Sequence, residues 1–281
     1  MRPAYSDQLQ LRRTAAELVA ARLAARALAD FPGTLPIDLD AAYACQDQAI
    51  SLWPDRIVGW KVGLIGAEWR TRYDEERLVG PIFARDLHPF PGDGSVAQVA
   101  IFDGGFAAIE AEYVFRIGRD TPPDKFAYGT PEAAEFAAGL HVAVEIASSP
   151  LASVNALGPA VTIADFGNNA GLLLGPAIAD WTPDVNANYT CLTEIEGRVV
   201  GRGGASMLPG GPLAALAFAL GRCARRGHPL RAGHHVTTGA STGVHEIRPG
   251  QHGRVVFDGV AEIRCLAVAR SPLPATTAGA G

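Results

Sequence analysis

Three glutamates in two strand-like segments are the residues whose types and spacing best suit chemistry. In residues 109–117 apolar and polar side chains alternate, so Glu110 and Glu112 would share one face of a strand. The segment 140–147 is apolar around Glu145, and an ionised carboxylate among apolar neighbours is costly unless a cation pairs with it. If the two strands are adjacent, the carboxylates form an all-oxygen cluster that suits a hard cation such as Mg²⁺ or Mn²⁺.

An ordinary explanation exists for part of this pattern. A Glu-x-Glu pair on a half-exposed strand is common without any metal, so alternation alone accounts for Glu110 and Glu112. Alternation does not account for Glu145, because an unpaired glutamate is rarely buried. Glu145 therefore favours the metal hypothesis over the ordinary explanation.

Lys61 is a second candidate for chemistry. Only two of the 24 basic residues are lysines, Lys61 and Lys125, and Lys61 lies inside the apolar run 57–65. Lysine can lose its proton at modest cost, whereas arginine cannot. The alternative is a lysine that extends from a strand edge to solvent. Two glycines in the same run, Gly59 and Gly63, predict a close backbone approach or a bulge.

Composition excludes several classes of protein. The chain has 281 residues and is 48% hydrophobic, enough for one large domain or two small ones with a sizeable core. A net charge of −5 gives no electrostatic footprint for nucleic acid, and apolar stretches such as 171–179 are too short to span a bilayer. The N-terminal pattern lacks the apolar region of a secretory signal. Four scattered cysteines without C-x-x-C spacing are typical of reduced thiols, so we expect a cytoplasmic protein.

The expected elements are helices first and strands afterwards. Periodicity predicts helices over 7–29 and 40–52, the second capped by Asp38, and the charged segment 66–79 predicts a surface flap. From about residue 96 the chain is rich in strands, with helices expected at 131–138 and 213–225. This order predicts an α+β fold with a mainly β body and argues against a doubly wound parallel sheet. The predicted units are an N-terminal region 1–85, a β-rich catalytic body 86–270 and a disordered tail 271–281.

Several motifs together resemble one known family. They are Gly-Trp-Lys-Val-Gly-Leu at 59–64, Glu110-x-Glu112, Val-Glu-Ile at 144–146, the glycine-rich turn before the 213–225 helix, and Ala-Gly-His-His-Val-Thr-Thr-Gly at 232–239. In this order they resemble the 2-keto-4-pentenoate hydratase / 4-oxalocrotonate decarboxylase family of the fumarylacetoacetate-hydrolase-like superfamily. The resemblance covers about residues 10–268.

The resemblance implies a mixed β-sandwich roll preceded by a smaller N-terminal helical region, and related enzymes assemble, so we expect a homo-oligomer. It implies Mg²⁺ or Mn²⁺ held by Glu110, Glu112 and Glu145, with Lys61 as the catalytic residue. Thr238, Asn169 and Arg70 are the expected substrate-binding residues, although strand propensity also explains Thr238 and a turn also explains Asn169. The implied reaction adds water to a 2-hydroxy-2,4-dienoate, a small 2-oxo/2-hydroxy dienoic acid, through an enolate of the 2-oxo acid.

Two departures from the family pattern keep other reactions open. Hydratases usually carry an Asp-Gln/Glu-Pro segment where residues 74–77 are Asp-Glu-Glu-Arg, and serines where this chain has two asparagines at 168–169. A decarboxylase acting on the diacid 4-oxalocrotonate needs a further cation, for which Arg70, Arg72 and Arg77 are candidates. A C–C hydrolase of acylpyruvates usually adds a His-Glu pair, and no histidine directly precedes Glu110. A non-catalytic partner subunit is the remaining alternative.

Overall fold

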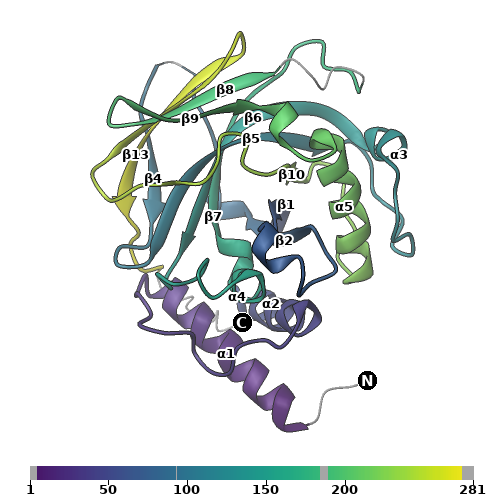
Figure 1. Ribbon diagram of the computed structural model, residues 1–281, viewed down its shortest axis with the longest axis vertical. Coiled ribbons are helices and arrows are strands. Elements are labelled where there is room, and N and C mark those ends of the chain that lie inside the picture. The colour runs from purple at the N-terminus through teal and green to yellow at the C-terminus, as the bar shows by residue number, and fades with distance from the viewer. Residues whose placement is uncertain (1–4, 93, 184–188, 274–281) are drawn as a thin grey trace, which may run out of the picture.

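The computed structural model describes residues 5–92, 94–183 and 189–273. Two helices come first, α1 (Tyr5–Leu23) and α2 (Leu39–Leu52), and they pack against each other at one end of the molecule (Figure 1). Strands with short helices between them make up the remainder. This order confirms the predicted α+β class with a mainly β body.

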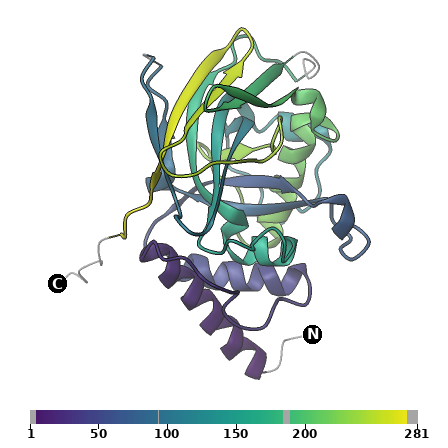
Figure 2. The same cartoon turned by 60° about the vertical axis from the view of Figure 1, so that its left-hand side comes forward.

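The strands form two sheets. The larger has eight strands, in the order β2 (Arg77–Phe83), β1 (Ile57–Leu64), β10 (His235–Thr237), β5 (Phe106–Ile117), β6 (Ala137–Ser149), β7 (Asn169–Ala177) and β3 (Leu87–Pro89), with β11 (His245–Glu246) also paired to β5. The smaller has five, in the order β4 (Ala97–Ile101), β13 (Ala261–Ala269), β12 (His252–Phe257), β8 (Thr190–Ile195) and β9 (Arg198–Gly204). Figure 2 shows the smaller sheet curled against the larger one.

Alternation along β5 decides which side chains meet the smaller sheet. Tyr113 packs edge-on against Phe257 of β12, with ring centroids 5.7 Å apart. Ile109, Ala111 and Phe115 belong to the same fully buried core. Because successive side chains point to opposite faces, Glu110 and Glu112 face away from the smaller sheet.

The register of β5 and β6 brings the third glutamate to that face. The two strands are antiparallel, Glu110 lies directly opposite Glu145, and Glu112 lies opposite Ala143. Directly opposed residues of an antiparallel pair point to the same side of the sheet. The strand pairing assumed from the sequence is therefore confirmed.

Helix α1 ends earlier than the sequence predicts. We expected a helix over 7–29, but α1 stops at Leu23 because Ala25 adopts a left-handed conformation with φ of 49°. The amide of Arg26 donates to the carbonyl of Ala21 at 2.9 Å, the backbone closure of a helix end that glycine usually makes. Because no glycine marks the end of this helix, the periodic pattern led us to predict a helix that extends too far.

The shorter elements largely follow the sequence. Asp38 caps α2 as expected, accepting from the amide of Ala41 at 2.7 Å. The predicted 131–138 helix is shorter and is followed directly by β6, and the 66–79 flap contains one 3₁₀ turn before β2 begins. The remaining bounds are α3 (Thr130–Ala134), α4 (Pro159–Ala164), α5 (Gly211–Arg225), η1 (Ala67–Trp69), η2 (Ala84–Asp86), η3 (Phe166–Asn168) and η4 (Ala205–Met207).

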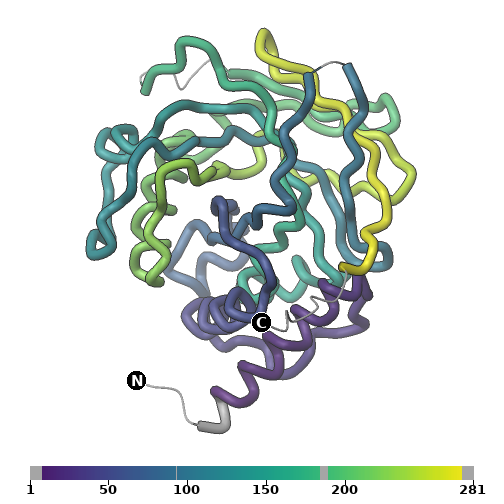
Figure 3. Tube along the Cα trace, turned by 180° about the vertical axis from the view of Figure 1, so that it is seen from behind, coloured from purple at the N-terminus to yellow at the C-terminus, as the bar shows by residue number. Residues whose placement is uncertain are grey.

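Strands β1 and β2 belong to the large sheet, although their residues fall in the predicted 1–85 region. Seen from behind, α1 and α2 lie together below the curled sheets (Figure 3). The division at residue 85 stays a prediction about folding units. Of the predicted tail, Leu273 donates its amide to the carbonyl of Leu23 at 2.8 Å, and residues 274–281 lie outside the described residues.

A close backbone approach fixes β1 beside β10. A Cβ on Gly59 would lie 2.2 Å from the carbonyl oxygen of His235, far inside van der Waals contact, so only glycine fits. The close backbone approach expected from the two glycines is therefore found at Gly59, whereas a Cβ on Gly63 would meet only side-chain atoms, at 3.4 Å or more. Among the described residues, no helix is both long and apolar enough to cross a membrane.

Candidate active site

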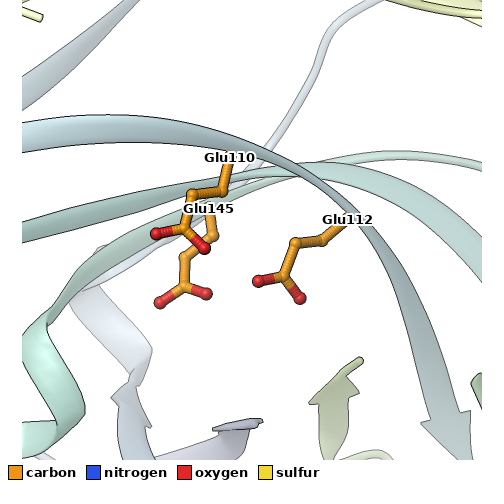
Figure 4. A group of neighbouring side chains, drawn as sticks. All are labelled: Glu110, Glu112 and Glu145. Carbon is orange, nitrogen blue, oxygen red and sulfur yellow. The ribbon is translucent and has the colours of Figure 1, made fainter. Parts of the chain in front are cut away.

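Glu110, Glu112 and Glu145 converge on one point. Each offers a carboxylate oxygen that lies within 4.8 Å of those offered by the other two. The three side chains extend from β5 and β6 to the same side of the sheet (Figure 4). Their exposed fractions are 6%, 0% and 0%. Three carboxylates at this separation and burial repel one another unless protons or a cation intervene.

Hydrogen bonds leave part of this cluster unsatisfied. One oxygen of Glu112 accepts from the amides of Thr238 at 3.0 Å and Gly239 at 2.8 Å. One oxygen of Glu145 accepts from the side-chain amide of Asn169 at 3.0 Å. The other oxygen of each glutamate is buried without a partner, which is rare and calls for an explanation. Hard divalent cations take such carboxylate oxygens as ligands, so the residues fit Mg²⁺ or Mn²⁺.

The electrostatics of the cluster agree with that fit. Burial raises the pKa of Glu110 to about 7, with Lys61 opposing the shift and Glu145 adding to it. Burial and the neighbouring Glu145 raise the pKa of Glu112 well above its ordinary value. With the protein groups alone, the cluster therefore holds protons near neutral pH. A divalent cation that binds there must displace them.

Lys61 completes the cluster from β1. Its Nζ lies 3.3 Å from Oε1 of Glu145, and the residue is 5% exposed. Burial lowers the pKa of Lys61, but the charges of Glu145, Glu110 and Glu112 outweigh burial and raise it. The sequence singled out Lys61 because a lysine can lose its proton at modest cost, which corresponds to a lowered pKa. With the carboxylates alone, the direction is the opposite, because their negative charge is not neutralised.

Two of the three predicted substrate-binding residues lie at the cluster. Thr238 is buried, its amide donates to Glu112, and its hydroxyl donates to the carbonyl of Tyr113 at 3.0 Å. Asn169 directs its amide at Glu145. Their contacts are with the carboxylates, so in this arrangement both residues orient the glutamates. Contact of either residue with substrate stays a prediction.

The third, Arg70, lies apart from the cluster. It is exposed at the end of η1, and its Nε donates to the carbonyl of Ile65 at 3.1 Å. It is not among the described residues that line the cavity beside the glutamates. The structure thus does not bring Arg70 to the carboxylates, and its role in binding substrate stays a prediction.

A cavity of about 550 Å³ opens beside Lys61 and Glu110. This volume lies within the range of small-molecule pockets, roughly 300–1,000 Å³. Its wall is mostly apolar, with two further carboxylates from Glu68 and Glu246. Its apolar lining includes Ile65, Trp69, Leu78, Phe106, Pro159 and Val244.

Asn168 also lines this cavity, which the sequence left undecided between a pocket amide and a turn residue. It is 4% exposed, its Oδ1 has no hydrogen-bond partner, and its backbone is left-handed with φ of 62°. Non-glycine residues held in that region often mark functional sites. The wall residues Trp69 and Thr162 were missed, since no pattern in the sequence relates them to the glutamates.

Asn169→Ala should weaken binding of Mg²⁺ or Mn²⁺ about tenfold or more, because outer hydrogen-bond partners of metal ligands typically contribute 10–100-fold to affinity. Titration calorimetry checks this. Asn155→Ala is the matched control, since Asn155 also lines the cavity but its amide makes no hydrogen bond to the three glutamates in the described contacts, and its affinity should stay within about twofold. Equal affinities for both variants would contradict the role assigned to Asn169.

The raised pKa of Glu110 predicts a pH dependence of stability. A carboxyl whose folded-state pKa is raised from 4.5 to about 7 favours the folded state below pH 4.5, and this contribution is lost as pH rises through about 7. Chelator-treated protein should therefore lose thermal stability between pH 5 and 8, and Glu110→Gln should lose less. Saturating Mg²⁺ should remove most of the difference, as followed by thermal melts. Stabilisation by Mg²⁺ that is as large at pH 5 as at pH 8 would contradict this.

Comparison with known proteins places this geometry in context. A scan against models of protein families finds no match. The chain is 30% identical over 208 residues to the TodF product hydratase of Pseudomonas putida, covering 72% of this chain and 74% of the relative. It is 28% identical over 259 residues to 2-keto-4-pentenoate hydratase 1 of Dechloromonas aromatica, covering 90% and 95%.

A solved structure shares the fold. The 4-oxalocrotonate decarboxylase from Pseudomonas putida G7, complexed with magnesium and adipate, superposes with a TM-score of 0.76 at 20% identity, covering 95% of this chain and 100% of that one. These relatives and the shared fold confirm the resemblance found in the motifs. The chain belongs to the 2-keto-4-pentenoate hydratase / 4-oxalocrotonate decarboxylase family of the fumarylacetoacetate-hydrolase-like superfamily, a family of lyase-type enzymes.

Proposed function

We propose that this enzyme is a divalent-metal-dependent hydratase that adds water to a 2-hydroxy-2,4-dienoate. The observation that carries the proposal is the buried cluster of Glu110, Glu112 and Glu145, with two partnerless oxygens and Lys61 beside it at the cavity. The hydratase relatives support the reaction. The magnesium complex of the decarboxylase neighbour supports a divalent ion, and we propose Mg²⁺ or Mn²⁺.

In this proposal the three glutamates hold the ion, which supplies Lewis-acid stabilisation of the negative charge that develops on a 2-oxo acid. Lys61 moves the proton. Its Nζ reaches both the cluster and the cavity, so it can hydrogen-bond the developing oxyanion or carry a proton between substrate atoms. Once a cation neutralises the glutamates, burial dominates and lowers the pKa of Lys61, which makes proton release easier.

The cavity favours a substrate with one carboxylate and a neutral tail. Among the described residues, Lys61 is the only cationic side chain that lines it. The predicted cations for a second carboxylate are not among the described residues that line the cavity. Arg77 donates to the carbonyl of Pro209, Arg70 donates to the carbonyl of Ile65, and Arg72 is exposed. Glu68 and Glu246 would repel an acidic tail. Hydration is therefore favoured over decarboxylation of 4-oxalocrotonate.

The C–C hydrolase alternative has no support from the cavity. That chemistry usually adds a His-Glu pair to activate water, and no histidine is found among the described residues that line the cavity.

Thr238, Asn169 and Arg70 as substrate contacts stay predictions, as do a homo-oligomeric state, a cytoplasmic location and the division into 1–85, 86–270 and the tail 271–281.

One assay separates the candidate activities. Purified protein with Mg²⁺ or Mn²⁺ is offered 2-hydroxypenta-2,4-dienoate, 4-oxalocrotonate and an acylpyruvate, and ultraviolet absorbance and carbon dioxide release are followed. The proposal predicts metal-dependent loss of dienoate absorbance without carbon dioxide. Carbon dioxide release from the diacid would favour the decarboxylase, and cleavage of the acylpyruvate would favour the hydrolase. Inactivity on all three substrates would favour the non-catalytic partner subunit.

A further inference from the structure

The turn from Asp165 to Asn169 is strained and lies next to the acidic cluster. Phe166, Gly167 and Asn168 are three successive left-handed residues, with φ of 54°, 67° and 62°. Left-handed backbone at a non-glycine residue is unfavourable and persists only where the surroundings impose it. This turn places Asn168 in the cavity wall and Asn169 against Glu145.

One side chain from α1 holds both ends of the turn. Arg22 is 3% exposed and pairs with the carboxylate of Asp165, through contacts of 2.5 and 2.9 Å. The same guanidinium donates to the carbonyl of Asp165 at 3.0 Å and to the carbonyl of Asn169 at 2.9 Å. The planar fork of arginine can satisfy several acceptors in fixed directions, which lysine cannot.

Arg22 also binds the strand that carries Glu145. It donates to the carbonyl of Ser148 on β6 at 3.3 Å. Its guanidinium lies over the rings of Phe102 and Phe166, at 5.4 and 5.1 Å from their centroids. Arg22 thus connects the start of β7, the end of β6, which is the strand of Glu145, and the strained turn.

We propose that Arg22 is a positioning residue for the metal site: it fixes the 165–169 turn so that Asn169 keeps Glu145 oriented toward the ion. The inference rests on the proposed metal function. It gives the N-terminal helix a part in the active site, although α1 contributes no residue to the cavity lining among those described. A purely structural Arg22 would affect stability and leave ion affinity unchanged.

The test is the affinity of Arg22→Lys for Mn²⁺, measured by titration calorimetry alongside thermal melts. We expect at least a tenfold weaker affinity, in the range found for outer partners of metal ligands. Arg226→Lys is the matched control, because the side chain of Arg226 is 5% exposed and pairs with Asp47, which is not one of the three clustered carboxylates. It should lower the melting temperature while affinity stays within about twofold.

Each outcome decides one claim. Wild-type protein that binds no Mn²⁺ would overturn the proposed function itself. Wild-type binding with unchanged affinity in Arg22→Lys would overturn only the positioning role. If Arg22→Lys does not fold, Asp165→Asn decides: it keeps the size of the side chain but removes the charge that pairs with Arg22, and at least a threefold loss of affinity is expected. Unchanged affinity there would refute the positioning role.

Discussion

Glu112→Gln and Glu145→Gln should each abolish tight binding of Mg²⁺ or Mn²⁺ and lower turnover at least about a thousandfold. The expectation follows because a bound ion supplies several kcal/mol of charge stabilisation in the transition state, and each 1.36 kcal/mol is a factor of ten in rate. An amide keeps the size of the side chain but offers a neutral and much weaker ligand. Calorimetry for ion affinity and steady-state kinetics on the dienoate measure both effects.

Glu246→Gln is the matched control for these variants. Glu246 lines the same cavity but is not part of the three-carboxylate cluster, so ion affinity should stay within about twofold. In chelator-treated protein, Glu112→Gln and Glu145→Gln should also be more stable than Glu246→Gln. Each removes one of three buried carboxylates that repel one another. If Glu112→Gln and Glu145→Gln bind the ion as tightly as the wild type, the cluster is not the metal site.

Lys61→Met should lower kcat by about 10²–10⁴, the usual contribution of a positioned proton-transfer group. Ion affinity should be kept or should increase, because the substitution removes a positive charge 3.3 Å from Glu145. This combination of intact ion binding and lost turnover distinguishes a catalytic lysine from one that only stabilises the cluster. Single-turnover kinetics with saturating Mg²⁺ measure the chemical step directly.

Lys125→Met provides the matched control, since the chain has only these two lysines. Lys125 pairs with Glu132 at the surface, and exposed ion pairs contribute roughly 0–1 kcal/mol to stability. Its kcat should equal that of the wild type within about twofold. Full turnover by Lys61→Met with the ion bound would refute the catalytic role of Lys61.

The acidic cluster could be predicted because its signal is local. Alternation in β5 assigned Glu110 and Glu112 to one face, and an apolar strand around Glu145 made that residue anomalous. The register that sets Glu110 opposite Glu145 could only be assumed, since nothing local fixes which strands pair. Local signals of the same kind also correctly predicted Asp38 as the cap of α2 and an apolar strand that contains Lys61.

Contacts between distant segments could not be predicted in this way. Arg22 and Asp165 are 143 positions apart, and Arg22 in a helix rich in arginine and alanine looks like any solvated residue. The left-handed residues Ala25 and Phe166 carry no turn signal, because neither is glycine or asparagine. Arg70 was proposed for substrate from its charge alone, and charge does not indicate where a side chain on a surface turn will lie.

The most direct test of the account is a crystal structure of the protein soaked with Mn²⁺, with anomalous data collected at the manganese edge. The account predicts one strong peak beside the face of β5 and β6 that carries the three glutamates, with a carboxylate oxygen of Glu110, Glu112 and Glu145 each at roughly 2.0–2.3 Å, the range for small hard divalent ions and oxygen ligands. A peak coordinated by other residues, or no peak at saturating Mn²⁺, would contradict the claim that these three glutamates hold the catalytic ion.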